Sequence, residues 1–214
     1  MKVLVVGANG QIGQKVVKLI QESEEHSPVA MVRKNEQKES LEKEGIHAVL
    51  ANLEDSVDEL AKVLQGVDGV IFTAGSGGST GADKTLLIDL DGAIKMMEAS
   101  EQAGVERFVL ISAIGADKRE NWSEEIKSYY VAKYYADKAL EQSKLNYTII
   151  RPGALINEPG TGNVWAGTDF EYGKIPREDV ARTVVASLTA EPTYRKAFNL
   201  ISGDTKIDEA VKNL

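Results

Sequence analysis

Residues Gly7–Gly13 read GANGQIG, a GxxGxxG stretch that directly follows the apolar run Val3–Val6. In such a loop Gly7 permits a tight turn off a strand, and Gly10 lets the backbone approach a pyrophosphate without a Cβ atom in the way. Gly13 allows the next helix to pack closely on the sheet. The amphipathic stretch behind the loop predicts that helix, whose N-terminal amides and positive dipole end would face the phosphates. Strand, loop and helix in this order predict a dinucleotide-binding βαβ unit.

Outward from this unit, apolar runs of strand length alternate with amphipathic stretches along the whole chain. Most of the runs lack polar–apolar alternation, which is typical of parallel strands that are covered on both faces. This alternation of strands and helices predicts an α/β fold: a doubly wound parallel sheet of the Rossmann type, with about seven strands and helices on both faces. The predicted strands are Val3–Val6, Val29–Val32, His47–Leu50, Gly69–Phe72, Arg107–Ile111, Tyr147–Ile150 and Ala197–Leu200.

One segment breaks this rhythm: residues 154–175 contain Pro159 and several glycines and show no steady period. In a doubly wound fold, an irregular segment after a late strand usually caps the ligand crevice. We therefore predict a single dinucleotide-binding domain over residues 1–214, with residues 154–175 as a small cap on the crevice. The run Gly75–Gly81 (GSGGSTG) follows another strand, and we interpret it as a flexible loop beside the cofactor.

Charge and composition narrow the class of protein. The formal net charge of −8 and the lack of a long Lys/Arg run argue against nucleic acid or an anionic membrane surface as a partner. No stretch has the roughly 18 apolar residues of a membrane-spanning helix. The chain has no cysteine and only two separated histidines, so we expect neither disulfides nor a metal site. These features predict a cytoplasmic protein that acts on a small molecule, as a monomer or homodimer.

The end of the second predicted strand indicates which dinucleotide would bind. An NAD-preferring site places Asp or Glu there to hold the ribose 2′-hydroxyl. Here the strand is followed by Arg33 and Lys34, and Arg33 stands 20 residues beyond Gly13. A guanidinium can bind a 2′-phosphate in bidentate fashion and stack on the adenine ring. The pair therefore predicts NADP(H) rather than NAD(H).

The ends of other strands predict further cofactor contacts, because ligands bind outside the carboxyl ends of parallel strands. Asn52 and Leu53 follow the third strand and would flank the adenine. Thr73, Ala74 and Gly75 follow the fourth and would approach the inner phosphate and ribose. Together with the glycine loop, the predicted cofactor-binding residues are Gly7, Asn9, Gly10, Gln11, Ile12, Gly13, Arg33, Lys34, Asn52, Leu53, Thr73, Ala74 and Gly75.

Later segments carry a resemblance to a known family. The fifth predicted strand runs into FVLISAIGA (Phe108–Ala116), and YYVAK (Tyr129–Lys133) and YTIIRPG (Tyr147–Gly153) follow it. With GANGQIG and the late IPREDVA (Ile175–Ala181), these motifs resemble the short-chain dehydrogenase/reductase superfamily. More narrowly, the chain resembles its atypical NAD(P)H-binding branch, which includes NmrA-like regulators, biliverdin/flavin reductases, quinone reductases and small epimerase-like proteins of Bacillus type. The resemblance covers essentially the whole chain and implies the fold and the cofactor, but not the substrate.

The resemblance also implies a catalytic pair, because Tyr129 and Lys133 match the family's YxxxK motif. Residues i and i+4 share one face of a helix, so the two side chains can act together. In the family's pattern the Lys133 ammonium holds the nicotinamide ribose hydroxyls and lowers the pKa of Tyr129, which gives or takes a proton. With Lys133, the implied cofactor contacts are completed by Pro152 and Gly153.

Other readings of this helix stay open. Tyr130 is adjacent to Tyr129 and is an alternative functional phenol, and Tyr134 with Lys138 repeats the same spacing one turn later. Lys133 is preferred over Lys138 because it lies at the family's distance from Arg151–Gly153.

The third catalytic position departs from the family's pattern. The family usually shows two serines after the fifth strand, whereas here Ser112 is followed by Ala113. A methyl group cannot hydrogen-bond a carbonyl or a developing oxyanion. Ser112 stays a candidate catalytic residue, although adjacent residues at the end of an extended strand point opposite ways. Asp89 lies near the family's usual Asn position, and we expect it to be solvated or structural.

Three hypotheses on function follow. The first is an NADP(H)-dependent oxidoreductase that transfers a hydride to or from a small organic acceptor, such as a quinone, a flavin-like compound or a carbonyl compound. The second, which Ala113 leaves open, is a non-catalytic NADP(H) redox sensor that regulates a partner protein. The third is a nucleotide-sugar epimerase- or dehydratase-like enzyme with tightly retained NAD, against which Arg33 and the short C-terminal region argue.

Overall fold

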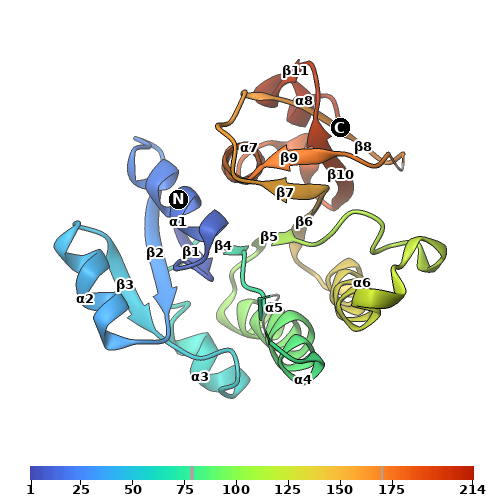
Figure 1. Cartoon of the computed structure of the whole chain (residues 1–214). Helices are drawn as coiled ribbons and strands as arrows, with labels where there is room; N and C mark the ends of the chain where they lie inside the picture. The colour runs from blue at the N-terminus through green and yellow to red at the C-terminus, as the bar shows by residue number, and fades with distance from the viewer. Residues whose placement is uncertain (78–79, 170) are drawn as a thin grey trace.

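The computed structural model describes residues 1–77, 80–169 and 171–214. Gly78 and Ser79 of the predicted glycine-rich loop, and Phe170 of the predicted cap, lie outside the described residues. A nine-stranded sheet runs through the molecule in the order β11-β8-β10-β6-β5-β4-β1-β2-β3, and helices cover both of its faces (Figure 1). The predicted α/β, doubly wound fold is therefore confirmed.

The seven predicted strands are all present, with ends that differ from the prediction by at most two residues. They are β1 (Lys2–Val6), β2 (Ser27–Val32), β3 (His47–Leu50), β4 (Gly69–Phe72), β5 (Arg107–Ile111), β6 (Asn146–Pro152) and β10 (Lys196–Ser202). All of them pair in parallel. β1 lies between β2 and β4. The chain first adds strands on one side of β1 and then crosses to add strands on its other side. A ligand crevice opens at the point where the strand order switches in this way.

Each central strand is apolar on both sides because both faces of the sheet are buried. In β1, Val3 and Val5 pack on one face of the sheet and Leu4 and Val6 on the other. Strands with this environment have no polar face, which explains why the sequence shows continuous apolar runs.

Four short strands were not predicted, and two of them enlarge the main sheet from the predicted seven strands to nine. They are β7 (Ala154–Ile156), β8 (Asn163–Gly167), β9 (Lys174–Pro176) and β11 (Thr205–Lys206). β8 pairs antiparallel with β10 and β11 and so continues the main sheet, whereas β7 and β9 form a small parallel pair apart from it. Much of the segment predicted as a cap is therefore strand, and its short, glycine-interrupted pieces gain their partners only in the folded molecule.

Helices complete the two outer layers. One face carries α1 (Gln11–Gln21), α7 (Arg177–Ser187) and α8 (Ile207–Lys212), and the other carries α3 (Val57–Lys62), α5 (Gly92–Ala103) and α6 (Lys127–Gln142) (Figure 1). The remaining helical segments are α2 (Asn35–Lys43), α4 (Ala82–Lys84), the π-helical η1 (Thr85–Asp91), and the 3-10 turns η2 (Arg119–Asn121), η3 (Glu124–Ile126) and η4 (Glu191–Thr193). No helix in the described part of the chain is both long enough and apolar enough to cross a membrane.

Candidate cofactor cleft and active site

The glycine loop is shaped by close backbone approaches that only glycine permits. Gly7 has φ +85°, and a Cβ atom on it would lie 2.7 Å from the backbone nitrogen of Ala74. A Cβ atom on Gly13 would lie 2.1 Å from the carbonyl oxygen of Gly7, so α1 packs directly against the turn. Gly10 precedes α1 and supplies no side-chain cap. The first-turn amides of α1 therefore remain available to a phosphate.

Two adjoining cavities open along the carboxyl ends of the strands. The smaller, of about 390 Å³, is lined by Arg33, and the larger, of about 1310 Å³, by Tyr129 and Lys133. Both are lined by Gly10 and by residues 73–76, so they meet at the glycine loop. The result is one trough from the end of β2, across the N-terminus of α1, to α6. An extended dinucleotide fits this course, with its pyrophosphate at the loop.

Most of the predicted cofactor contacts line this trough. They are Gly7, Asn9, Gly10, Gln11, Ile12, Arg33, Leu53, Thr73, Ala74, Gly75, Lys133, Pro152 and Gly153. Gly13 lies beneath the loop, and Lys34 and Asn52 line neither cavity. Asn52 is engaged locally, because its Oδ1 accepts a hydrogen bond from the backbone N–H of Glu54 (3.2 Å). Lys34 forms the N-cap position of α2 and is exposed.

The end of the trough at β2 carries a positive charge without a countercharge. Arg33 is exposed and lines the smaller cavity, and it forms no ion pair with any described residue. The side-chain oxygen of Gln37 accepts hydrogen bonds from the backbone N–H groups of Arg33 and Lys34 (3.3 Å each), which fixes the backbone that carries the guanidinium. Lys84 from α4 lines the same cavity and pairs with Glu54 (2.7 Å), a contribution that was not predicted from the sequence.

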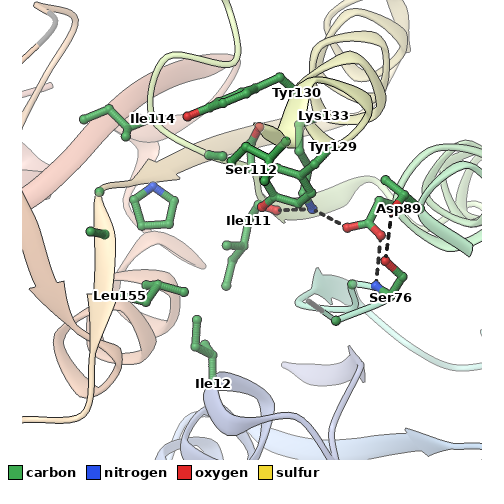
Figure 2. Close-up of a pocket in the computed structure, with 18 of the residues that line it drawn as sticks. Ile12, Ser76, Asp89, Ile111, Ser112, Ile114, Tyr129, Tyr130, Lys133 and Leu155 are labelled. Atoms are coloured by element: carbon green, nitrogen blue, oxygen red, sulfur yellow. Dashed lines mark hydrogen bonds and ion pairs between the residues drawn. The ribbon is translucent and has the colours of Figure 1, made fainter. Parts of the chain in front are cut away.

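At the other end, Lys133 is a buried charged group of the site. It is 4% exposed, its Nζ donates to the carbonyl oxygen of Ile111 (3.2 Å), and it forms an ion pair with Oδ1 of Asp89 (3.4 Å) (Figure 2). Its Nζ lies 5.6 Å from the centroid of the Tyr129 ring. Burial alone would lower the pKa of Lys133, but Tyr129, Asp89 and Asp137 outweigh it, so its pKa is raised and the ammonium is retained.

The phenol of Tyr129 behaves differently from the expectation that Lys133 lowers its pKa. Burial raises the pKa of Tyr129, Lys133 lowers it, and the carboxylates of Asp89 and Asp137 raise it. The net result is a pKa above that of an ordinary tyrosine. A phenol of this kind keeps its proton at neutral pH and can act as a proton donor.

Ser112 is a buried hydroxyl at the wall of the larger cavity. It is 3% exposed, and its Oγ has no hydrogen-bond partner among the described residues. Burial raises the pKa of the Asp137 carboxyl, and the nearby Ser112 hydroxyl opposes this rise, although its geometry is not that of a hydrogen bond. Ala113 lines the cavity as well, so the wall offers one hydroxyl where the family's pattern has two.

Of the two expectations for Asp89, solvated or structural, its buried and paired carboxylate agrees with the structural one. It is 2% exposed, and its Oδ2 accepts a hydrogen bond from the backbone N–H of Ser76 (2.9 Å). It lies on the π-helical turn η1, which packs against α6. The carboxylate therefore links the loop after β4 to Lys133, as the dashed lines in Figure 2 show.

The two alternative tyrosines, Tyr130 and Tyr134, have different surroundings. Tyr130 lines the larger cavity and stacks on Trp122, with ring centroids 6.4 Å apart and an interplanar angle of 5°. Tyr134 and Lys138 line neither cavity: Lys138 pairs with Glu141 (2.6 Å), and Tyr134 packs against Trp122. The site therefore brings together Tyr129, Tyr130 and Lys133 and leaves out the second pair.

Apolar side chains form much of the wall opposite the catalytic pair. Ile12 and Leu155 face Ile114 and Tyr130 across the larger cavity (Figure 2). Leu155 is 36% exposed, and an apolar side chain left open at a cavity is typical of a ligand-binding wall. Part of the predicted cap, including residues 154, 155 and 172–174, lines this cavity, whereas β8 does not.

Comparisons with known proteins agree with this geometry. Residues 7–191 match the family described as NAD(P)H-binding. The chain is 61% identical over 214 residues, the full length of both, to the "Uncharacterized sugar epimerase YhfK" of Bacillus subtilis. It superposes with a TM-score of 0.93 and 41% identity, over 100% of both chains, on a Bacillus halodurans protein named for a proposed NAD-dependent epimerase/dehydratase activity. It also superposes on the oxidoreductase ylbE of Lactococcus lactis with a TM-score of 0.90 and 33% sequence identity, over 100% of this chain and 96% of that one.

Proposed function

The chain belongs to the NAD(P)H-binding family, and from this premise we propose that it is an NADP(H)-dependent oxidoreductase that reduces a small organic acceptor. The observation that carries the proposal is the course of the trough. One end carries the guanidinium of Arg33, which forms no ion pair among the residues that the structure describes, the middle is the glycine loop, and the other end carries the Tyr129–Lys133 pair.

The preference for NADP(H) rests on charge at the end of β2. A 2′-phosphate would find the Arg33 guanidinium free of a carboxylate partner and the backbone held by Gln37. A guanidinium binds a phosphate in bidentate geometry, whereas a site for an unmodified ribose uses a carboxylate. Neither Arg33 nor Lys34 offers an acceptor for a 2′-hydroxyl.

The roles of the catalytic side chains follow from their positions. When bound, the reduced dinucleotide would supply a hydride to the acceptor. Tyr129 donates its phenol proton to the acceptor oxygen or nitrogen that gains the electron pair, and water restores that proton afterwards. Lys133 holds the ribose hydroxyls nearby, and Ser112 offers a hydroxyl with no other partner among the described residues to orient the acceptor.

The acceptor class follows from the wall of the larger cavity. Ile114, Tyr130 and Leu155 offer apolar surface on opposite sides, which suits a flat ring compound such as a quinone or a flavin-like molecule. A simple carbonyl compound is a further candidate, since Ser112 can hydrogen-bond its oxygen.

A panel of quinones, flavins and carbonyl compounds tests the proposal, with the loss of NADPH as the readout. We expect at least one acceptor to be reduced, and we expect Lys133→Ala to slow its reduction by about 10²-fold or more. If no acceptor is reduced faster by the wild-type chain than by Lys133→Ala, the chain is not this oxidoreductase.

A second candidate function is suggested by the relatives named as epimerases. A nucleotide-sugar epimerase returns its hydride to the same substrate and therefore keeps NAD tightly bound. Extraction of the nucleotide from the purified chain distinguishes the two. Stoichiometric NAD would favour the epimerase, and a chain that binds and releases NADPH favours the oxidoreductase.

A further inference from the structure

Asp89 occupies a place where a carboxylate is costly unless it is paired. It lies in η1, a π-helical turn between α4 and α5, and it is 2% exposed. Turns of this kind carry an extra residue relative to an α-helix and often occur at functional sites. A buried carboxylate that is retained in such a turn calls for a specific partner.

Both oxygens of Asp89 have partners, and the partners come from different elements. Oδ2 accepts the backbone N–H of Ser76 (2.9 Å) in the loop after β4, and Oδ1 lies 3.4 Å from Nζ of Lys133 on α6. A Cβ atom on Gly75 would lie 3.1 Å from Oδ1, so the loop backbone packs directly on the carboxylate. Asp89 thus joins a loop that lines both cavities to the lysine of the catalytic pair.

The ammonium of Lys133 is committed before any ligand arrives. Its ion-pair partner is the carboxylate of Asp89 and it donates to the carbonyl oxygen of Ile111, while its Nζ lies 5.6 Å from the centroid of the Tyr129 ring. The positive charge that would favour a phenolate is therefore balanced within the protein.

We propose that Asp89 is a positioning residue: its carboxylate balances the Lys133 ammonium and anchors it to the Ser76 loop, so that Tyr129 keeps its proton until an acceptor takes it. The site is therefore set for reduction, in which the phenol O–H bond breaks and its proton joins the atom that has gained the hydride electrons. Only this last step rests on the proposed function. The balance of charge around Tyr129 is a property of the chain alone.

The other charged groups near Tyr129 do not replace Asp89. Asp137 also raises the pKa of Tyr129, but its Oδ2 is held by Nε of Arg151 (2.8 Å), which balances its charge. Tyr130 lies beside Tyr129, with ring centroids 6.1 Å apart, and is neutral in the same pH range. Removing the charge of Asp89 takes away one group that raises the pKa of Tyr129 and leaves Lys133 unbalanced. Both changes lower that pKa.

A spectroscopic titration of the tyrosines tests the proposal on the chain without any ligand. The contribution of Tyr129 is the difference between a chain and the same chain carrying Tyr129→Phe. Asp89→Asn keeps an oxygen for the Ser76 amide, Asp89→Glu keeps the charge, and Asp91→Asn is the control. Asp91 lies in the same turn but pairs with Lys95 (3.0 Å) and is 54% exposed.

We expect Asp89→Asn to shift the Tyr129 titration to lower pH, and we expect Asp89→Glu and Asp91→Asn to leave it close to that of the wild type. An unchanged Tyr129 titration in a folded Asp89→Asn chain, as judged by circular dichroism, overturns the proposal. If Asp89→Asn does not fold, the same comparison is made with Lys133→Met. Removing the ammonium leaves the Asp89 carboxylate unbalanced beside Tyr129, so the Tyr129 titration should shift to higher pH, and adding Asp89→Asn to that variant should reverse the shift. A shift that the added Asp89→Asn does not reverse contradicts the balance.

The rate of reduction supplies a second readout that separates this inference from the proposed function. In Asp89→Asn the ratio of the rate at moderately alkaline pH to the rate at neutral pH should fall about three- to tenfold, because the phenol loses its proton earlier. If no acceptor is reduced at all, the proposed function fails and the titration still decides the inference. If acceptors are reduced but neither the titration nor the rate ratio moves, the inference alone fails.

Discussion

Tyr129 and Tyr130 are neighbours in sequence and both reach the larger cavity, yet they have different surroundings. Tyr129 lies beside the paired Lys133 and Asp89, whereas Tyr130 stacks on Trp122 at the cavity wall. A tyrosine that transfers a proton needs its hydroxyl group and nearby charges that set its pKa. A tyrosine that only stacks needs its ring and not its hydroxyl group. The two phenols should therefore respond differently to the loss of their hydroxyl groups.

We expect Tyr129→Phe to lower kcat for acceptor reduction about 10²-fold and to leave the Kd for NADPH within about twofold. Tyr130→Phe keeps the stacked ring and should change kcat less than about threefold. Steady-state kinetics and NADPH titration of both variants measure this. The reverse order of the two effects would identify Tyr130 as the proton donor.

The pH dependence of reduction follows from the raised pKa of Tyr129. The donor must be protonated, and burial together with Asp89 and Asp137 keeps the phenol protonated beyond the range of an ordinary tyrosine. The rate should therefore stay level from neutral to moderately alkaline pH and fall only at higher pH. A rate that already falls between neutral pH and the usual tyrosine range contradicts this assignment.

Among the elements, β5, β6 and α7 are tied together by one buried cation. Arg107 on β5 is 4% exposed, and its guanidinium donates to the carbonyl oxygens of Asn146 (2.6 Å) and Leu188 (2.9 Å) and to Oγ1 of Thr148 (2.7 Å). Burial lowers the pKa of Arg107 to about 10, which still leaves it charged at neutral pH. Ser112 directly follows β5 and Pro152 ends β6, so the hydrogen bonds of Arg107 also stabilise the strands that position these two site residues.

Arg107→Leu leaves several buried acceptors without a donor, and it should lower the free energy of unfolding by about 3 kcal/mol or more. Arg182→Leu is the control, because Arg182 is 43% exposed and pairs with Glu178 on the surface of α7. It should cost less than about 1 kcal/mol. Urea unfolding of both variants measures the difference, and equal costs would show that Arg107 is not a structural tie.

Most strands of the parallel block could be predicted because they are buried on both faces, so a run of apolar residues marks them; the edge strand β3 is the more exposed exception. The short strands β7, β8, β9 and β11 could not, since each depends on a partner that is distant in sequence. No local pattern in the sequence indicates the π-helical turn η1, which packs against α6.

The candidate site likewise has features that the sequence could predict and features that it could not. The glycine loop and Arg33 could be predicted because a backbone turn and the end of a strand carry local signals. For Asp89 the sequence left open whether it is solvated or structural, because its burial and its partner Lys133 depend on a helix more than 40 positions away. The expected lowering of the Tyr129 pKa by Lys133 is outweighed chiefly by the burial of the phenol, to which Asp89 and Asp137 add, and burial depends on the folded chain.

On the scale of the whole molecule, the trough is lined by residues at the carboxyl ends of at least six strands, so its ligand should stabilise the fold as a unit. NADPH at about one hundred times its Kd should raise the free energy of unfolding by about 2.7 kcal/mol. A thermal melt with and without NADPH measures this, and Gly13→Ala, which forces α1 away from Gly7, should abolish the difference. A melt that NADPH leaves unchanged contradicts the placement of the cofactor.

The single domain and the monomer or homodimer stay predictions for the whole chain. They lead us to expect one cooperative unfolding transition and a light-scattering mass of one or two chains. Two separate transitions, or a larger assembly, would contradict them.

The central claim is that the trough binds NADP(H) through Arg33, and a paired titration with NADPH and NADH tests it most directly. It is made on the wild type, on Arg33→Asp, and on Lys34→Asp as the control that lines neither cavity. We expect the wild type and Lys34→Asp to bind NADPH at least about tenfold more tightly than NADH, which is about 1.4 kcal/mol, and we expect Arg33→Asp to lose that preference. Equal affinities for the two dinucleotides in the wild type, or no binding of either, would contradict the account.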